Sequence, residues 1–142
     1  IGDVVDPASG RVIAGARGSD GRTPLDSMAA ICDGQLPAAL LDGMATTICI
    51  VATDAQLTTA QANKLASMAH DGLARAINPV HTQTDGDTLF ALATGGSGKT
   101  GHLTVLGALA AEVTARAVLN AVRAAHGLAV PHLPSARELG LA

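Results

Sequence analysis

The spacing of hydrophobic and polar residues predicts two buried strands and two helices in this 142-residue chain. Unbroken runs of apolar or β-branched residues occupy positions 46–52 (TTICIVA) and 88–94 (TLFALAT), and such runs are typical of strands buried on both faces. Apolar residues recur at helical spacing over positions 58–77 and 103–126. We therefore expect the order strand, helix, strand, helix, which indicates an α/β fold.

Local signals bound both predicted helices. Thr58 and Gln61 form a capping box at the start of the first helix, and the Asn78-Pro79 pair ends it because proline disfavours a helical residue before it. Gly72 lies inside this helix at a cost of roughly 1 kcal/mol relative to alanine, which close packing would explain. The face of the first helix is expected to bury Ala62, Leu65, Met68, Ala69, Leu73, Ala76 and Ile77. The second is expected to bury Leu106, Ala110, Val113, Ala117, Ala121 and Ala124, with Gly127 as its C′ residue.

The remaining segments read as a hairpin, loops and a tail. Short apolar pieces at 4–5 and 11–14 flank the turn sequence DPASG, which predicts a β-hairpin. We expect an exposed loop over 15–29, a short helical turn within 34–43, and a tail over 131–142 with one helical turn after Ser135.

Composition narrows the function classes. Hydrophobic residues make up 48% of the chain and aromatic residues 1%, so the core must consist of Ala, Leu, Val and Ile. A net charge of −3 argues against nucleic-acid binding, and the low charge together with many alanines indicates helix surfaces buried between subunits. No apolar stretch reaches the about 18 uncharged residues that a membrane span needs, and no signal peptide is visible. Cys32 and Cys49 show no metal or disulfide spacing, so we expect a reduced, cytoplasmic setting with Cys49 a small buried residue.

A glycine-rich segment offers a first candidate site. Positions 93–100 (ATGGSGKT) match a relaxed phosphate-loop pattern between a strand and a helix, with Lys99 placed to reach phosphate oxygens and Thr100 to hold Mg²⁺. Too few strands follow it, and no apolar strand ending in Asp follows. A flexible loop is therefore the favoured interpretation, and nucleotide binding stays an alternative.

A second candidate is a metal site built from His81, Asp85 and Asp87 with His70 or Asp71. His70 and Asp71 are helix neighbours that point in different directions. We therefore expect no metal, and a histidine satisfied by ordinary contacts.

The third candidate is Thr46 with the carboxylates of Asp85 and Asp87. A small residue followed by Thr at the start of a strand is a plausible self-cleavage point, and cleavage between Ala45 and Thr46 would give Thr46 a free α-amine beside its hydroxyl. Buried carboxylates need a partner, and that ammonium would supply one. On residue types alone, an ordinary turn at Asp85–Asp87 and a β-forming Thr46 stay open.

Several ordered motifs carry a resemblance. The segments at 46–55, 69–75 (AHDGLAR), 81–82, 85–88 (DGDT) and 90–95 resemble the C-terminal part of the DmpA-like aminopeptidase/esterase family, above all its branch of nylon-oligomer endohydrolases. The resemblance implies an α/β/β/α sandwich, a precursor that cleaves itself, Thr46 as nucleophile, Asp85 and Asp87 as the acidic pair that orients it, no cofactor and a homotetramer.

The resemblance also implies how the chain is divided. Residues 1–142 would form the C-terminal part of one hydrolase domain, with 1–45 ending the α-chain segment and 46–142 forming the β-chain segment. The N-terminal part of the same protomer would be the partner and would supply an Asn and a Lys. Ala45 stands where the nylon-hydrolase branch has Asn, but the related ornithine acetyltransferases, which share the fold, cut between Ala and Thr.

Together these features predict a self-processing amidohydrolase or aminopeptidase. It would cleave small peptides or ω-amino acid oligomers through an acyl-enzyme on Thr46, with an acyltransferase relative of ornithine acetyltransferase as an alternative.

Overall fold

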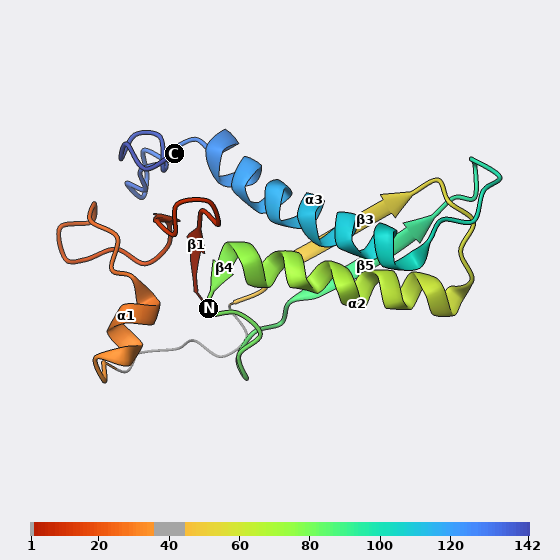
Figure 1. Ribbon diagram of the computed structural model, residues 1–142. Helices are drawn as coiled ribbons and strands as arrows, with labels where there is room; N and C mark the ends of the chain where they lie inside the picture. The colour runs from red at the N-terminus through yellow and green to blue at the C-terminus, as the bar shows by residue number, and fades with distance from the viewer. Residues whose placement is uncertain (1, 36–44) are drawn as a thin grey trace.

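The computed structural model describes residues 2–35 and 45–142, so the predicted helical turn within 34–43 falls mostly outside the described part. The fold is a mixture of helices and sheets, as the pattern predicted (Figure 1). The strands are β1 (Asp3–Val5), β2 (Val12–Ala14), β3 (Ile48–Thr53), β4 (Ile77–Asn78) and β5 (Thr88–Ala93). The helices are α1 (Ser27–Cys32), α2 (Thr59–Ala76) and α3 (Leu103–Ala124).

Strands β3 and β5 pair in parallel, and α2 is the crossover between them. Ile48 pairs with Thr88 at one end and Thr53 with Ala93 at the other, without a bulge. A parallel pair requires such a crossover because the chain must return to the same end of the sheet. In Figure 1, α2 and α3 lie side by side along this pair.

The core lies between this strand pair and the two helices. Its buried members are Val51, Leu65, Ala69, Leu89 and Ala110. The capping box at Thr58 and Gln61 is confirmed, and α2 buries Leu65, Ala69, Leu73 and Ala76 of its predicted face. Gly72 is buried against α3, and a Cβ atom there would lie 2.6 Å from Thr114 Cβ and also meet the Ala111 carbonyl. Close helix packing therefore explains this glycine.

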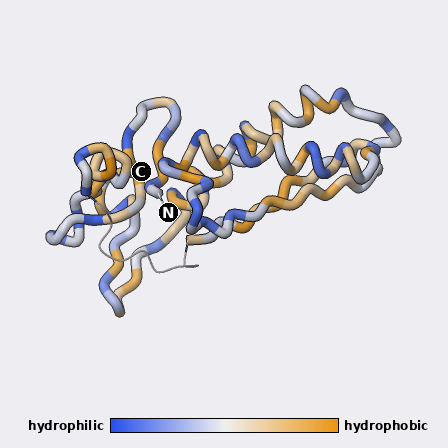
Figure 2. The backbone as a smooth tube through the Cα atoms, turned by 90° about the horizontal axis from the view of Figure 1, so that it is seen from below, coloured by the Kyte–Doolittle hydropathy of each residue, from blue (hydrophilic) through white to orange (hydrophobic). Residues whose placement is uncertain are grey.

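The prediction that both strands are buried on both faces is wrong for the described structure. Ile48 and Ile50 are each 70% exposed, Phe90 56% and Leu92 54%. Alternation along a strand sends every second side chain to the opposite face, and α2 and α3 cover one face only. We call these four residues the apolar outer face. Figure 2 shows how frequent hydrophobic residues are in this elongated half of the molecule.

The predicted face of α3 is also partly wrong. Ala110 is buried as expected, but Val113 is 51% exposed, and Ala117, Ala121 and Ala124 are exposed as well. The residues that α3 buries are Gly107, Ala110, Ala111, Thr114, Ala115 and Leu119. Because α3 lies close to α2, mostly small side chains fit between the two helices. The spacing of apolar residues carries no information on side-chain size and therefore did not predict this face.

Helix α3 ends earlier than predicted. Its last residue is Ala124, and Ala125 is extended with φ −66° and ψ 144°, so Gly127 is not its C′ residue. By length and composition alone this helix is apolar enough to cross a membrane. In the structure it packs along α2 and carries the charged residues Glu112 and Arg116 at its middle.

The hairpin prediction is confirmed by the antiparallel pairing of β1 with β2. Two short elements were not predicted. Helix α1 begins inside the expected loop, where the Asp26 side chain accepts a hydrogen bond from the Ala29 amide, and β4 extends α2 to pair with β1. Both are too short to show a hydrophobic period. After Ser135 the tail makes the expected turn, with the Leu139 amide bonded to the Ser135 carbonyl.

Candidate active site

The candidate site lies where β3 and β5 begin. Thr46 and Thr47 precede β3, and Asp85, Gly86 and Asp87 precede β5. The pairing continues beyond the strands, because the Gly86 amide donates to the Ala45 carbonyl at 2.8 Å and the Thr88 amide to the Thr47 carbonyl at 2.8 Å. Parallel strands in equal register start side by side. This geometry brings the segments of Thr46 and Asp85 together, although the two residues are 39 positions apart in the chain.

The hydroxyl of Thr46 rests against Gly86. A Cβ atom on Gly86 would lie 2.7 Å from Thr46 Oγ1, so only glycine leaves this approach free. Thr46 is exposed and lines a cavity of about 230 Å³ together with Ala45, Thr47 and Asp87. The other wall of the cavity comes from the antiparallel sheet and its flank, through Gly2, Val4 and Ile77. The predicted self-cleavage point thus faces a hollow that has room for a small group.

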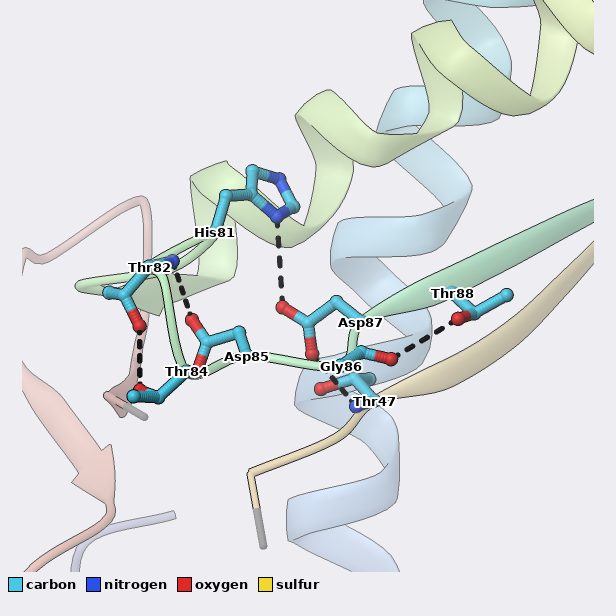
Figure 3. A network of polar contacts seen from close by, with 8 residues as sticks. All are labelled: Thr47, His81, Thr82, Thr84, Asp85, Gly86, Asp87 and Thr88. Atoms are coloured by element: carbon cyan, nitrogen blue, oxygen red, sulfur yellow. Dashed lines mark hydrogen bonds and ion pairs between the residues drawn. The ribbon is translucent and has the colours of Figure 1, made fainter. Parts of the chain in front are cut away.

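The carboxylate of Asp87 is mostly buried, with a side chain 7% exposed. Its Oδ1 accepts a hydrogen bond of 2.8 Å from the Thr47 amide, and its Oδ2 lies 3.7 Å from His81 Nδ1 (Figure 3). A carboxylate bonded to a backbone N–H is a strong, charge-assisted contact. Asp87 therefore ties the start of β5 to the residue that follows Thr46.

Asp85 is held by its own turn. The Thr82 amide donates to Asp85 Oδ2 at 2.8 Å, and the Asp85 amide donates back to the Thr82 carbonyl at 3.1 Å. Burial by itself would raise the pKa of Asp85, but hydrogen bonds to the carboxylate, among them that from the Thr82 amide, hold the pKa below its usual value. The site thus holds Asp85 as an anion at neutral pH.

Of the two histidines that the sequence grouped with the carboxylate pair, His81 lies beside Asp87, and His70 contacts the ring of His81. The ring of His81 faces Asp87, and the ring of His70 on α2 meets it edge-on with centroids 5.1 Å apart. The sequence assigned His81 no role beside Asp87, although the polar run from His81 to Asp87 puts both residues in one short segment. Within residues 2–35 and 45–142, no group of three His, Cys, Asp or Glu side chains is arranged to hold a metal ion.

The glycine-rich segment lies at the opposite end of the strand pair from Thr46, between β5 and α3. Its amides already have partners inside the protein: Gly96 donates to Thr94 Oγ1, Ser97 to the Asp54 carbonyl, Gly98 to the Gly95 carbonyl and Lys99 to Ser97 Oγ. A phosphate loop needs such amides to point together at the ligand. The geometry therefore favours an ordinary loop.

The two cysteines differ in exposure. Cys32 is exposed and Cys49 half-buried in β3. Desolvation, and secondarily the negative charge of Asp87, raises the pKa of the Cys49 thiol. A thiol with a raised pKa is a poor nucleophile, which fits the expectation of a small apolar side chain.

Comparison of the sequence with known proteins shows the family to which the chain is related. The model of peptidase family S58 matches residues 9–132. An uncharacterized aminopeptidase of Mycobacterium tuberculosis is 39% identical over 155 aligned positions, which cover 97% of this chain and 44% of the relative. An uncharacterized aminopeptidase of Mycobacterium leprae is 48% identical over 102 positions, covering 63% of this chain and 28% of the relative.

A third relative is named for a different activity. The 6-aminohexanoate-oligomer endohydrolase of a Kocuria species is 34% identical over 137 positions, covering 87% of this chain and 38% of the relative. The chain spans less than half the length of these relatives. The family match covers most of the chain and bears out the resemblance to DmpA-like enzymes and to nylon-oligomer hydrolases, so the chain belongs to peptidase family S58.

Proposed function

We propose that this chain carries the nucleophile of a self-processing enzyme that hydrolyses amide bonds, with Thr46 as that nucleophile. The observation that carries the proposal is the position of Thr46 Oγ1, which lies against Gly86, the residue that separates Asp85 from Asp87 in the chain; Thr46 also lines a cavity. Membership in a peptidase family and relatives named aminopeptidase and endohydrolase support the reaction class.

Self-cleavage would begin at the Ala45 carbonyl. Thr46 Oγ1 adds to the carbonyl carbon, and negative charge develops on the oxygen that already accepts the Gly86 amide at 2.8 Å. A donor aimed at that oxygen stabilises the tetrahedral state. The proton that Oγ1 loses is transferred to the Thr46 nitrogen as the C–N bond breaks, which leaves an ester on Oγ1 and a free amine on Thr46, and water then hydrolyses the ester.

The freed α-amine would serve as the general base in later turnovers. It accepts the hydroxyl proton as Oγ1 attacks the substrate carbonyl, and water hydrolyses the resulting acyl-enzyme. Asp85 and Asp87 hold the ammonium and the hydroxyl in place, since one carboxylate already binds the adjacent Thr47 amide. Oxyanion donors for the substrate would come from the N-terminal part of the protomer.

The apolar outer face supports the finer fold assignment. Four large side chains on β3 and β5 are more than half exposed, and the relatives are more than twice as long as this chain. We propose that a second sheet, supplied by the N-terminal part of the protomer, covers this face and completes an α/β/β/α sandwich that assembles into a homotetramer. Apolar patches of this kind mark surfaces that another element buries.

The substrate class follows from the names of the relatives and from the small cavity. We propose short peptides or linear ω-amino acid oligomers. Assays with and without an amine acceptor separate hydrolysis from acyl transfer, because only a transferase forms the acylated amine.

The test compares Thr46→Ala with Thr46→Ser in the complete protein. Mass spectrometry of the wild type should show a new N-terminus at Thr46, and the purified protein should hydrolyse an amide substrate. Thr46→Ala should do neither, whereas Thr46→Ser keeps a hydroxyl and should retain part of both activities. Cleavage or hydrolysis at the wild-type rate in Thr46→Ala would remove Thr46 from the mechanism.

A further inference from the structure

His81 has an unusual backbone conformation beside the candidate site. Its φ of 57° is in the left-handed region, and among the described residues the only other non-glycine residue with positive φ is Asp26. This conformation is unfavourable for a non-glycine residue, so the surrounding structure must hold it. Asparagine, aspartate and histidine adopt it more readily than other residues do.

Two contacts fix the ring that this backbone presents. His81 Nδ1 lies 3.7 Å from Asp87 Oδ2 (Figure 3). The ring of His81 also meets that of His70 at an interplanar angle of 62°. The His81 side chain is 38% exposed, whereas that of Asp87 is 7% exposed. The histidine therefore approaches a mostly buried carboxylate from the solvent side, with α2 supporting its ring through His70.

The two oxygens of Asp87 have different neighbours. Oδ1 accepts the Thr47 amide at 2.8 Å, and Oδ2 faces His81. The torsion that turns a carboxylate is broad, so a contact to one oxygen alone leaves its plane loosely defined. A second contact on Oδ2 defines the plane and thereby the direction of the bond to Thr47. At 3.7 Å this contact is longer than a direct hydrogen bond, and it places the Nδ1 side of the ring against Oδ2.

We propose that His81 is a positioning residue for Asp87, which in turn holds the segment of the nucleophile Thr46. Its imidazole orients the carboxylate of Asp87, the carboxylate holds the Thr47 amide, and that amide sets the place of Thr46 at the start of β3. His70 limits the rotation of the His81 ring. The inference rests on the proposed function and adds to it His81, to which that function assigns no role.

The experiment compares His81→Asn with His81→Gly in the complete protein. Both replacements tolerate the positive φ, so the backbone of the turn is preserved in each. Asparagine keeps an N–H donor on Cγ, where the histidine has Nδ1, and glycine removes it. The measurements are the rate of self-cleavage and, on processed protein, kcat and KM.

We expect His81→Gly to lower the self-cleavage rate and kcat about tenfold or more with KM nearly unchanged, because misplaced reacting groups affect the chemical step. His81→Asn should recover most of the loss, although both variants should melt at similar temperatures. A purely structural role would lower the melting temperature and would not separate the two variants. Equal kcat values in the two variants would overturn the positioning role.

A second readout does not depend on activity. In the Thr46→Ala background, ¹⁵N-threonine labelling reports the backbone amide of Thr47, which Asp87 Oδ1 accepts. We expect this signal to move in His81→Gly and to stay near its original position in His81→Asn; an unmoved signal in both overturns the inference. Activity that survives Thr46→Ala would overturn the proposed function instead, and the Thr47 signal would still decide whether His81 orients Asp87.

Discussion

The hydroxyl of Thr46 lies 2.7 Å from the point that a Cβ atom on Gly86 would occupy. Real Cβ atoms do not approach other atoms so closely, so any side chain at position 86 must displace the threonine or the turn. The amide of Gly86 also donates a hydrogen bond to the Ala45 carbonyl. Gly86 thus touches both the proposed nucleophile and the bond that the nucleophile would cut.

We expect Gly86→Ala to slow self-cleavage and hydrolysis by about 10²-fold, because a displacement near 1 Å costs about that factor. Mass spectrometry over time and kcat on the complete protein provide the measurements. Gly18→Ala is the matched control, since a Cβ atom there meets nothing closer than 3.7 Å. Wild-type rates in Gly86→Ala would show that Thr46 Oγ1 does not act from this position.

Asp87→Asn tests the charge of the buried carboxylate separately from its hydrogen bond. The amide oxygen of asparagine still accepts the Thr47 N–H, so we expect the fold to persist. Loss of a charged partner of the Thr46 ammonium is worth roughly 1.5–3 kcal/mol, which corresponds to a fall in kcat of about 10- to 100-fold. Asp54→Asn, at the far end of the strand pair, should retain wild-type kcat. Equal rates in the two variants would contradict a role for the Asp87 charge.

Gly72→Ala tests the contact between α2 and α3. A Cβ atom would lie 2.6 Å from Thr114 Cβ and 3.0 Å from the Ala115 amide nitrogen, so the helices must separate. Overpacking costs about 1–3 kcal/mol, which outweighs the roughly 1 kcal/mol that alanine gains over glycine in a helix. Urea unfolding should show this lower stability. Gly107→Ala should be milder, because the side chain it meets is the flexible Met68; stabilisation by Gly72→Ala would disprove the close contact.

The Asp20 turn should make part of the stability sensitive to acid. Hydrogen bonds from the Thr23 hydroxyl and from the Arg22 and Thr23 amides lower the pKa of Asp20 from 3.8 to about 2. Since the folded-state pKa is the lower one, this stabilisation is complete above about pH 4 and is lost as the pH falls through 2. Urea unfolding at a series of pH values should therefore show a shallower acid decline for Asp20→Asn than for the wild type. Parallel curves would contradict this assignment.

Local sequence signals determined the order of the main elements. The capping box at Thr58 and Gln61, the turn at 6–10 and the long periodic segments each act through neighbours within a few residues, so their outcome does not depend on the rest of the fold. Elements of two to six residues, α1 and β4, carry no such period. They exist because β4 pairs with β1, and because the buried Asp3 accepts the Ser27 amide at the start of α1.

Burial was decided by tertiary structure. An apolar run cannot say which face of a strand a helix will cover, and the sequence therefore predicted burial for Ile48, Ile50, Phe90 and Leu92, which the described structure exposes. In α3, the close approach of α2 at Gly72 leaves room mainly for small side chains, so residues such as Ala111 and Ala115 are buried and Val113 is exposed. Both errors arise because hydrophobicity indicates how favourable burial is, and packing geometry decides which side chains are buried.

The candidate site divides in the same way. The sequence by itself offered Thr46, Asp85 and Asp87 as candidates: residue types left an ordinary turn and a β-forming threonine open, and the resemblance to DmpA-like enzymes favoured the catalytic interpretation. Only the tertiary structure showed that β3 and β5 are parallel and in register, that Gly86 contacts Thr46, and that His81 faces Asp87. These relations join residues far apart in the chain, and their distances depend on how the crossover helix α2 packs against the strand pair.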